Sequence, residues 1–170
     1  MRTSATALIL PLLITILIAG CFDIDNIGPD PEDGDLRLII HLDDLNYDLA
    51  PASMVLKIEL RNIADHAVVV EESFSFGTSL FPTITGSNGS KVILSYPILD
   101  YSPEYSLFES GEVKKLEIDI AHMAPSMETD DTMIDFNWGI QDDYEISVGY
   151  WGSRNPLEVR SNTLTIHLEE

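Results

Sequence analysis

Cys21 is the only cysteine in the 170-residue sequence, and it lies where a long apolar run meets an acidic stretch. A thiol can act as a nucleophile, bind a metal, pair in a disulfide or carry a covalent group. Because there is no second cysteine, neither an intrachain disulfide nor a paired-cysteine metal site can form. The stability of a folded domain must therefore come from its core.

The residues before Cys21 have the three parts of a secretory signal peptide. Arg2 and the chain amine give a positive start, residues 7–19 are almost entirely apolar, and Ala19 and Gly20 are small. The apolar run is shorter than the ~20 residues that comfortably span a bilayer as a helix. We expect residues 1–20 to be a cleaved leader; the alternative is an uncleaved N-terminal membrane anchor.

Ile18-Ala19-Gly20-Cys21 resembles the lipobox of prokaryotic lipoproteins. The resemblance implies that the Cys21 thiol receives a lipid and that the chain is cut just before it. Two lipid chains at one site would hold a protein on a membrane far more firmly than a single acyl chain. The resemblance therefore predicts a cell-membrane, lipid-anchored protein that faces outside the cytoplasm, with Cys21 in no redox or metal role.

Catalytic and cofactor motifs are missing from the sequence. It has no serine nucleophile elbow and no glycine-rich phosphate loop. We therefore expect no enzymatic activity, no catalytic residues and no cofactor.

Metal binding has two weak candidates. His41 and His167 could form a two-histidine site if the first and last strands are neighbours, but isolated strand histidines are usually solvated. Two acidic clusters offer oxygens for calcium, which needs six to eight ligands in a cage. Neither cluster has the helix–loop–helix calcium spacing, so we expect solvated acids and no metal. The clusters are Asp30, Glu32, Asp33 and Asp35, and Asp130, Asp131 and Asp135.

Two further stretches offer a modification site and a binding site. Asn88-Gly89-Ser90 is an N-glycosylation sequon, although Asn-Gly is also the strongest short hairpin signal. Loops at the ends of β-sandwiches often bind partners, and Trp, Tyr and Arg dominate interface energies. The candidate ligand-binding loop therefore holds Tyr150, Trp151, Arg154 and Asn155, with Trp151 capping the core edge as the alternative.

The charge of the chain is strongly negative. The full sequence carries −20 at pH 7, and removal of residues 1–20 takes away Arg2 and no acid, which leaves −21. Such a surface repels nucleic acid, whose phosphates need clustered Lys and Arg. It also disfavours a domain that lies flat on anionic lipid.

The rest of the chain divides into a tether and one domain. Residues 21–35 follow the leader as the lipidated cysteine and a flexible acidic tether, because they hold too few apolar side chains for a core. Residues 36–170 have the size of one domain. Within it, apolar residues alternate with polar ones in seven segments: residues 36–44, 53–62, 67–72, 90–96, 112–122, 144–151 and 162–170.

Seven alternating segments without an amphipathic helix predict an all-β fold. We expect an immunoglobulin-like antiparallel β-sandwich of about 7–8 strands, with Tyr144 near the start of the penultimate strand as in many such folds. The aromatic or turn-rich residues 73–81, 95–108 and 121–133 are placed on loops or short edge strands.

The order of these segments is similar to Ig-like modules of prokaryotic surfaces. It also resembles, more faintly, BsuPI-like proteinase inhibitor sandwiches, where a strand that ends in Asn and a Pro-Gly-Glu turn recur. Here these features are Asn62 and Ser110-Gly111-Glu112. We expect a non-enzymatic surface lipoprotein that binds a protein or glycan or has a structural role; the alternative is an extracellular proteinase inhibitor.

Overall fold

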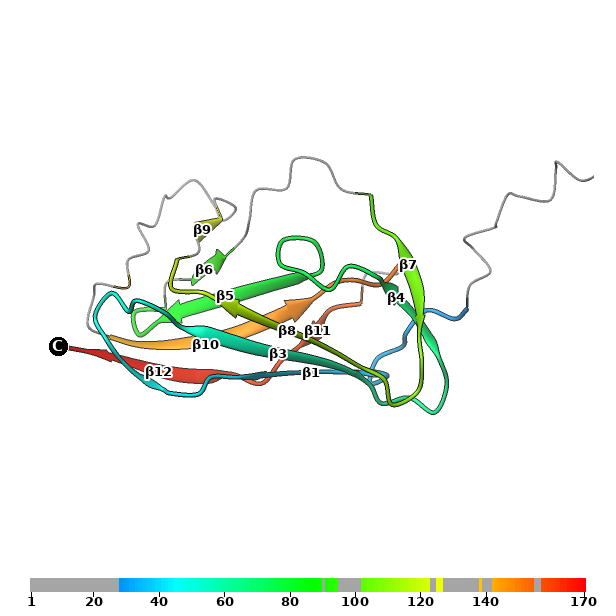
Figure 1. The fold of residues 1–170 in the computed structure, drawn as a ribbon, viewed down its shortest axis with the longest axis horizontal. Helices are drawn as coiled ribbons and strands as arrows, with labels where there is room; N and C mark the ends of the chain where they lie inside the picture. Colours follow the sequence, from blue (N-terminus) through cyan, green and yellow to red (C-terminus); the bar gives the residue numbers. More distant parts are fainter. Residues whose placement is uncertain are drawn as a thin grey trace, which may run out of the picture.

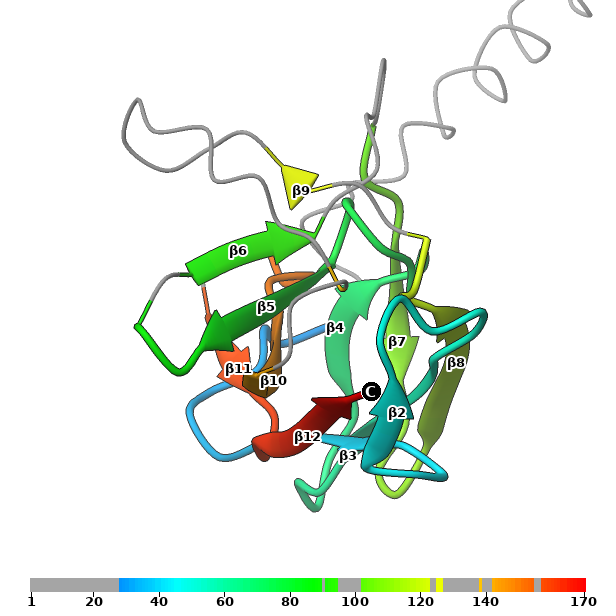
Figure 2. The same cartoon turned by 90° about the vertical axis from the view of Figure 1, so that its left-hand side faces the viewer.

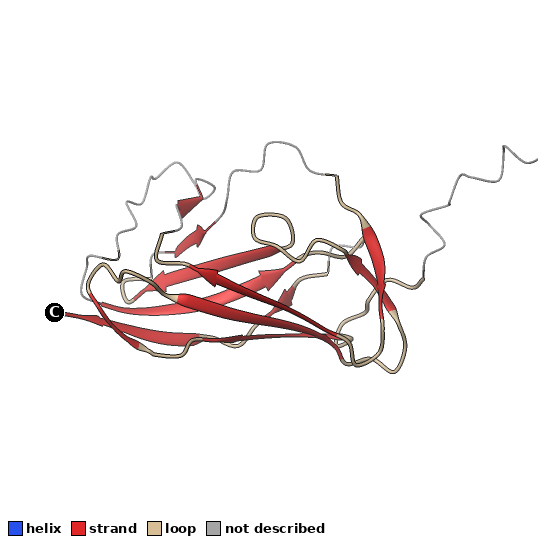
Figure 3. Ribbon diagram, viewed as in Figure 1, coloured by secondary structure: helices blue, strands red, loops and turns tan. Residues whose placement is uncertain are grey.

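The structure is a computed structural model, and it describes residues 28–89, 91–94, 102–122, 125–126, 138, 142–154 and 157–170. Figure 3 shows that the ordered elements among these residues are β-strands joined by loops and turns. No helix long and apolar enough to cross a bilayer occurs within these ranges.

Twelve strands are present in the described parts of the chain. In chain order they are β1 (Leu36–His41), β2 (Asn46–Asp48), β3 (Val55–Asn62), β4 (Val68–Glu71), β5 (Leu80–Gly86), β6 (Lys91–Leu94), β7 (Tyr105–Phe108), β8 (Val113–Asp119), β9 (Pro125–Ser126), β10 (Asp142–Tyr150), β11 (Val159–Arg160) and β12 (Leu164–Glu169).

The strands form two layers and a short crossing pair. One sheet has the order β1-β3-β8, the larger sheet has the order β2-β12-β10-β5-β6-β9 with β11 on β10, and β4 pairs with β7. Figure 2 looks along the molecule and shows β5, β6 and β10 on one side with β8 on the other. All pairings are antiparallel except β12 with β2. The predicted all-β, immunoglobulin-like sandwich is confirmed.

Alternation of apolar and polar residues builds the core. In β10 every second residue from Tyr144 to Tyr150 is buried, and in β3 the same holds from Leu56 to Asn62. Inward side chains of both sheets meet in one cluster, as expected when each strand buries a single face. Each of the seven predicted segments contains a strand.

β5 is a long strand that the alternation did not predict. It pairs with β10 over seven residues, from Leu80 opposite Tyr150 to Gly86 opposite Tyr144. Pro82 lies inside it, and proline usually argues against an inner strand because it has no N–H. β6 pairs only with Thr83 to Thr85, so Pro82 lies where β5 has no partner on that side among the described strands.

Asn62 joins β3 to the crossing pair β4–β7. Its side chain is fully buried and its Nδ2 donates to the carbonyls of His66 and Phe108, at 2.9 and 2.8 Å. Its Oδ1 accepts the Ala64 N–H at 2.9 Å. The Asn62 backbone N–H donates to the Glu112 carbonyl, and the Asn62 carbonyl accepts the Gly111 N–H. Asn62 therefore holds the β3–β4 loop against the β7–β8 turn.

The described part of the predicted flexible tether is built into the domain, so this prediction is wrong from Gly28 onward. Pro31 is buried, the Pro29 carbonyl accepts the Val69 N–H at 2.8 Å, and the Asp35 carbonyl accepts the Ile63 N–H at 2.8 Å. Val69 is buried on β4, and Gly28 lies against its side chain. Composition alone misses this because the apolar partners come from the domain.

The outer edge of β1 is occupied by one side chain. Asn162 Oδ1 accepts the Ile40 N–H at 2.9 Å, and its Nδ2 donates to the Ile40 carbonyl at 3.2 Å. These are the two hydrogen bonds that a neighbouring strand would offer. Asn162 thus closes this edge near the C-terminal end of β1.

Candidate functional site

The three described residues of the predicted ligand-binding loop have different environments, and Tyr150 is the most buried of them. It is 1% exposed, its ring packs on Phe74 with centroids 6.1 Å apart, and its hydroxyl donates to the Gly152 carbonyl at 2.9 Å. Burial raises the pKa of this phenol. Tyr150 therefore supports the loop from below and leaves no surface for a partner.

Arg154 is engaged with the N-terminal segment. Its Nε donates to Asp30 Oδ1 at 2.7 Å, and its Nη2 donates to the Gly28 carbonyl at 2.7 Å. Both side chains of the ion pair are mostly buried, at 19% and 24% exposure. Its role in this structure is to hold residues 28–30 on the domain. The fourth residue, Asn155, lies outside the described residues.

Among the described residues of the predicted loop, Trp151 is the one that is open to solvent. It is 49% exposed, and its ring lies against Phe81 with centroids 4.9 Å apart and planes tilted by 35°. Its N–H donates to the Ser79 carbonyl at 2.9 Å, which fixes the backbone beneath the ring. An exposed indole on a fixed backbone can contact a ligand at little entropic cost.

Neighbouring strands add charge to this aromatic pair. Gly149 of β10 lies opposite Phe81 of β5 on one side and opposite Arg160 of β11 on the other. A Cβ at Gly149 would lie 3.6 Å from Glu158 Oε1 and 4.0 Å from the Trp151 indole nitrogen, so both border this glycine. The Glu158–Arg160 ion pair measures 2.8 Å. We name Phe81, Gly149, Trp151, Glu158 and Arg160 the Trp151 surface.

Sequence reasoning identified only Trp151 of this surface. Phe81 requires knowledge that β5 pairs with β10, and the two charged residues require knowledge that β11 pairs on the other side. The one available signal was the alternation that places Gly149 on the outward face of β10 and continues to Trp151 just after the strand. Gly149 has no side chain to show that pattern.

A polar group is buried where β4 meets the 73–79 loop. Glu71 is 4% exposed and accepts a hydrogen bond from the Thr78 hydroxyl, while its N–H donates to the Gly152 carbonyl at 2.6 Å. Burial raises the pKa of Glu71. Lys114 Nζ donates to the Glu71 carbonyl at 2.8 Å, and burial lowers the pKa of this lysine. The hydroxyls of Ser73, Ser75 and Thr78 bond one another beside it. These bonds hold the loop in place.

The histidines of the possible two-histidine site lie in different sheets. His41 Nε2 is 3.5 Å from Asp43, whereas His167 Nδ1 is 2.6 Å from Asp143. The second pair borders a hollow of about 450 Å³, which is lined by Asn46, Asp142, Asp143, His167, Leu168 and Glu169. Across the described ranges, no three His, Cys, Asp or Glu side chains are arranged to hold a metal ion.

The predicted modification sites are only partly described. Asn88 is exposed at the turn of the β5–β6 hairpin, where the Gly89 N–H donates to the Gly86 carbonyl at 2.9 Å. Gly89 has φ +80°, so the Asn-Gly pair makes the turn that its sequence predicts. Ser90, the lipobox with Cys21, and the acids 130–135 lie outside the described residues.

Comparison with known proteins adds no functional assignment. No family model and no curated protein matches the chain. A β-glucuronidase from Bacteroides uniformis is similar at 12% identity and a TM-score of 0.38, and the match covers 77% of this chain but 13% of that one. The CARDB domain of a Pyrococcus furiosus protein, in complex with di-metal ions, is similar at 11% identity and a TM-score of 0.41, over 86% and 97% of the two chains. These likenesses are too distant to inform function.

Proposed function

We propose that this protein is a lipid-anchored, non-enzymatic binding module outside the cytoplasm, held by Cys21 and binding through the Trp151 surface. The observation that carries the binding role is the half-exposed indole of Trp151, fixed on Phe81 beside the Glu158–Arg160 pair. Aromatic and arginine side chains are enriched among the residues that dominate binding energy. The apolar leader and the lipobox-like Ile18-Ala19-Gly20-Cys21 support the anchor.

The anchor is tested by Cys21→Ser in the full chain. The thioether lipid needs sulfur, so the serine variant should move from the membrane to the soluble fraction or keep its leader. Thr15→Ser is the matched control, because it alters another residue of the leader and leaves the thiol. Mass spectrometry of the membrane-bound parent should find a lipid on Cys21. A parent with an unmodified thiol and an intact leader would contradict the anchor.

The binding role is tested with a photocrosslinking amino acid at position 151 of the lipidated protein in intact envelopes. We expect one discrete adduct from this position. The control is the same group at Leu45, which is also exposed, at 40%, but lies in the loop before β2. Arg160→Ala in the position-151 variant should weaken the adduct, because it removes a charge that borders position 151. Equal labelling from both positions would contradict a specific Trp151 surface.

Proteinase inhibition is a second candidate, on the resemblance to BsuPI-like sandwiches. One observation favours that resemblance: Asn62 and the turn Ser110-Gly111-Glu112 lie together, with the Gly111 N–H donating to the Asn62 carbonyl at 3.0 Å. The full chain, solubilised in detergent, should then slow at least one class of purified extracellular proteinase. No inhibition of serine, cysteine, aspartic or metallo-proteinases would discard this candidate.

A further inference from the structure

Residues 28–35 are fixed to one particular end of the sandwich. Gly28 lies against Val69 of β4 and Leu107 of β7, so close that a Cβ at this position would be 2.7 Å from Leu107 Cδ2. The two hydrogen bonds from Arg154, to Asp30 and to the Gly28 carbonyl, hold the same segment from the other side. The chain therefore leaves the described domain at a defined place.

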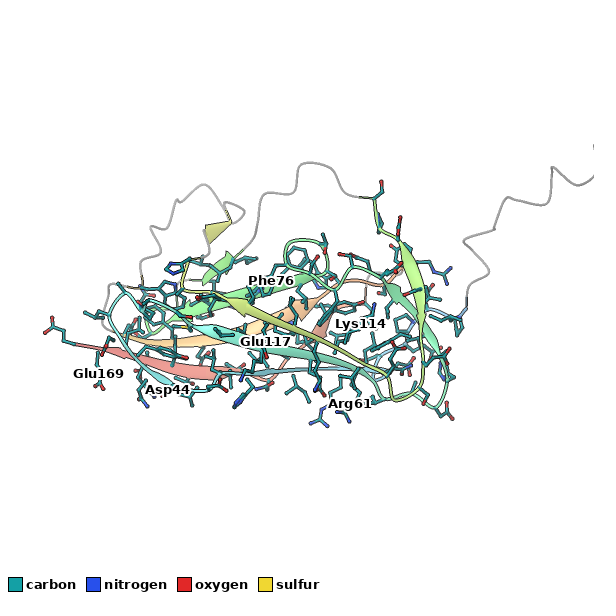
Figure 4. All side chains as sticks on the ribbon, viewed as in Figure 1. Asp44, Arg61, Phe76, Lys114, Glu117 and Glu169 are labelled. Atoms are coloured by element: carbon teal, nitrogen blue, oxygen red, sulfur yellow. The ribbon has the colours of Figure 1, made fainter. Side chains whose placement is uncertain are left out.

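That place is the end of the long axis that carries β4 and β7. Figure 1 shows the blue N-terminal segment beside these two strands and the C-terminus at the opposite end. In Figure 4, Asp44 and Glu169 mark the C-terminal end, and Lys114 lies toward the other. The acidic hollow between Asn46 and Glu169 belongs to the C-terminal end.

The length of chain before Gly28 sets how far this end can stand from a lipid on Cys21. Six residues lie between the two positions, and the seven Cα-to-Cα steps of a fully extended chain reach at most ~25 Å. β10 alone, with nine residues, extends for ~30 Å. The chain between Cys21 and Gly28 is thus too short for the C-terminal end to face the membrane. That end could contact the membrane only if the domain lay on its side. A net charge of −21 after loss of the leader disfavours that position on anionic lipid.

We infer that the β4–β7 end of the domain faces the lipid surface and that the C-terminal end, with its acidic hollow, faces away from it. This rests on the proposed lipid anchor. The Ile63 side chain, 52% exposed in the β3–β4 loop, belongs to the lipid-facing end. Trp151 also lies near this end, because its neighbour Gly152 bonds Glu71 of β4.

The orientation is tested by energy transfer on vesicles that contain anionic lipid and an acceptor dye on the lipid headgroups. The full lipidated protein is labelled with a donor dye at Ile63→Cys or, as the matched control, at Glu169→Cys, while Cys21 carries the lipid. Transfer from position 63 should exceed transfer from position 169 by about twofold or more, because the two ends differ in height by ~30 Å. Arg154→Ala in both labelled proteins should reduce the difference in energy transfer between positions 63 and 169. The substitution frees residues 28–30 and so lengthens the flexible connection to the lipid.

The outcomes separate this inference from the proposed anchor. Equal transfer from the two positions, in protein that carries the lipid by mass spectrometry, would overturn the orientation and leave the anchor standing. A chain that lacks the lipid and elutes apart from the vesicles would overturn both. Circular dichroism of each labelled protein verifies that the β-rich fold is kept.

Discussion

The side-chain amide of Asn62 donates a 2.8 Å hydrogen bond to the backbone carbonyl of Phe108, a residue 46 positions later in the chain. Phe108 ends β7 and is itself fully buried. Because the same amide also bonds the loop that leads to β4, Asn62 connects both strands of the crossing pair to the β1-β3-β8 sheet. The end of the domain near Gly28 depends on this connection.

Replacement of Asn62 by Ala should be strongly destabilising. It removes three side-chain hydrogen bonds and leaves the carbonyls of His66 and Phe108 without this donor. We expect the free energy of unfolding to fall by about 3 kcal/mol, measured by urea denaturation. Asn46→Ala, at an exposed strand position, is the control and should change it by less than about 0.5 kcal/mol. Equal effects of the two substitutions would contradict the role of Asn62.

The contact between Asp30 and Arg154 should show coupling in a double-mutant cycle. The double variant should lose about 1 kcal/mol less free energy of unfolding than the sum of the losses from Asp30→Ala and Arg154→Ala. This coupling is expected because the ion pair is partly shielded from water. Arg154→Ala should also speed hydrogen exchange of the Val69 amide, which bonds the Pro29 carbonyl. Additive effects of the two substitutions, with unchanged exchange at Val69, would show that residues 28–30 are held by other contacts.

Tyr150→Phe should lower stability at neutral pH by about 1 kcal/mol, because it removes the buried bond to Gly152. The pKa of Tyr150 is raised from 10.0 by burial, so its neutral phenol stabilises the folded state below pH 10. That contribution is lost as the pH rises through 10 toward the folded-state pKa. Urea denaturation at about pH 8 and about pH 11 should show the advantage of the parent shrinking. Tyr105→Phe, at a partly buried position, is the control. A pH-independent difference between Tyr150→Phe and the parent would contradict this assignment.

Glu71→Gln should stabilise the protein at neutral pH. Burial raises the pKa of Glu71 above 4.5, so the folded state favours the protonated acid and loses stability as the pH rises through that range. The neutral amide keeps an acceptor for Thr78 and avoids a buried charge. Thermal unfolding should give a higher Tm for the variant at pH 7, and the same Tm for both proteins below about pH 4. A lower Tm for the variant at neutral pH would show that neighbouring groups stabilise the ionised Glu71 carboxylate in the folded protein.

Alternation was sufficient to locate the strands that bury one face. β1, β3, β10 and β12 each show a clear period of two, and each forms as expected. β5 was harder to predict from the sequence. Its first residues resemble the aromatic loop before it, and Pro82 has no N–H to donate within the strand. β4 is buried along its whole length, so its β-branched run has no polar face to show. Part of its cover comes from Gly28, in a segment with the composition of a linker.

The candidate site was harder to predict than the fold. The sequence indicated Trp151 and Arg154 together, but the structure gives them separate roles, since Arg154 pairs with an acid 124 positions earlier. No local pattern predicts a partner at that separation. The charges beside Trp151 come from β11, a strand of only two residues that has no periodicity to detect.

Asn162 has a consequence for many copies of this protein on one surface. An uncovered strand edge is a template on which a second chain can add its own strand, and so begin aggregation. Proteins held in a plane by lipid meet one another more often than proteins in bulk solution. By bonding both polar groups of Ile40, Asn162 denies an incoming chain the C-terminal part of β1, so crowded neighbours can collide there without joining sheets.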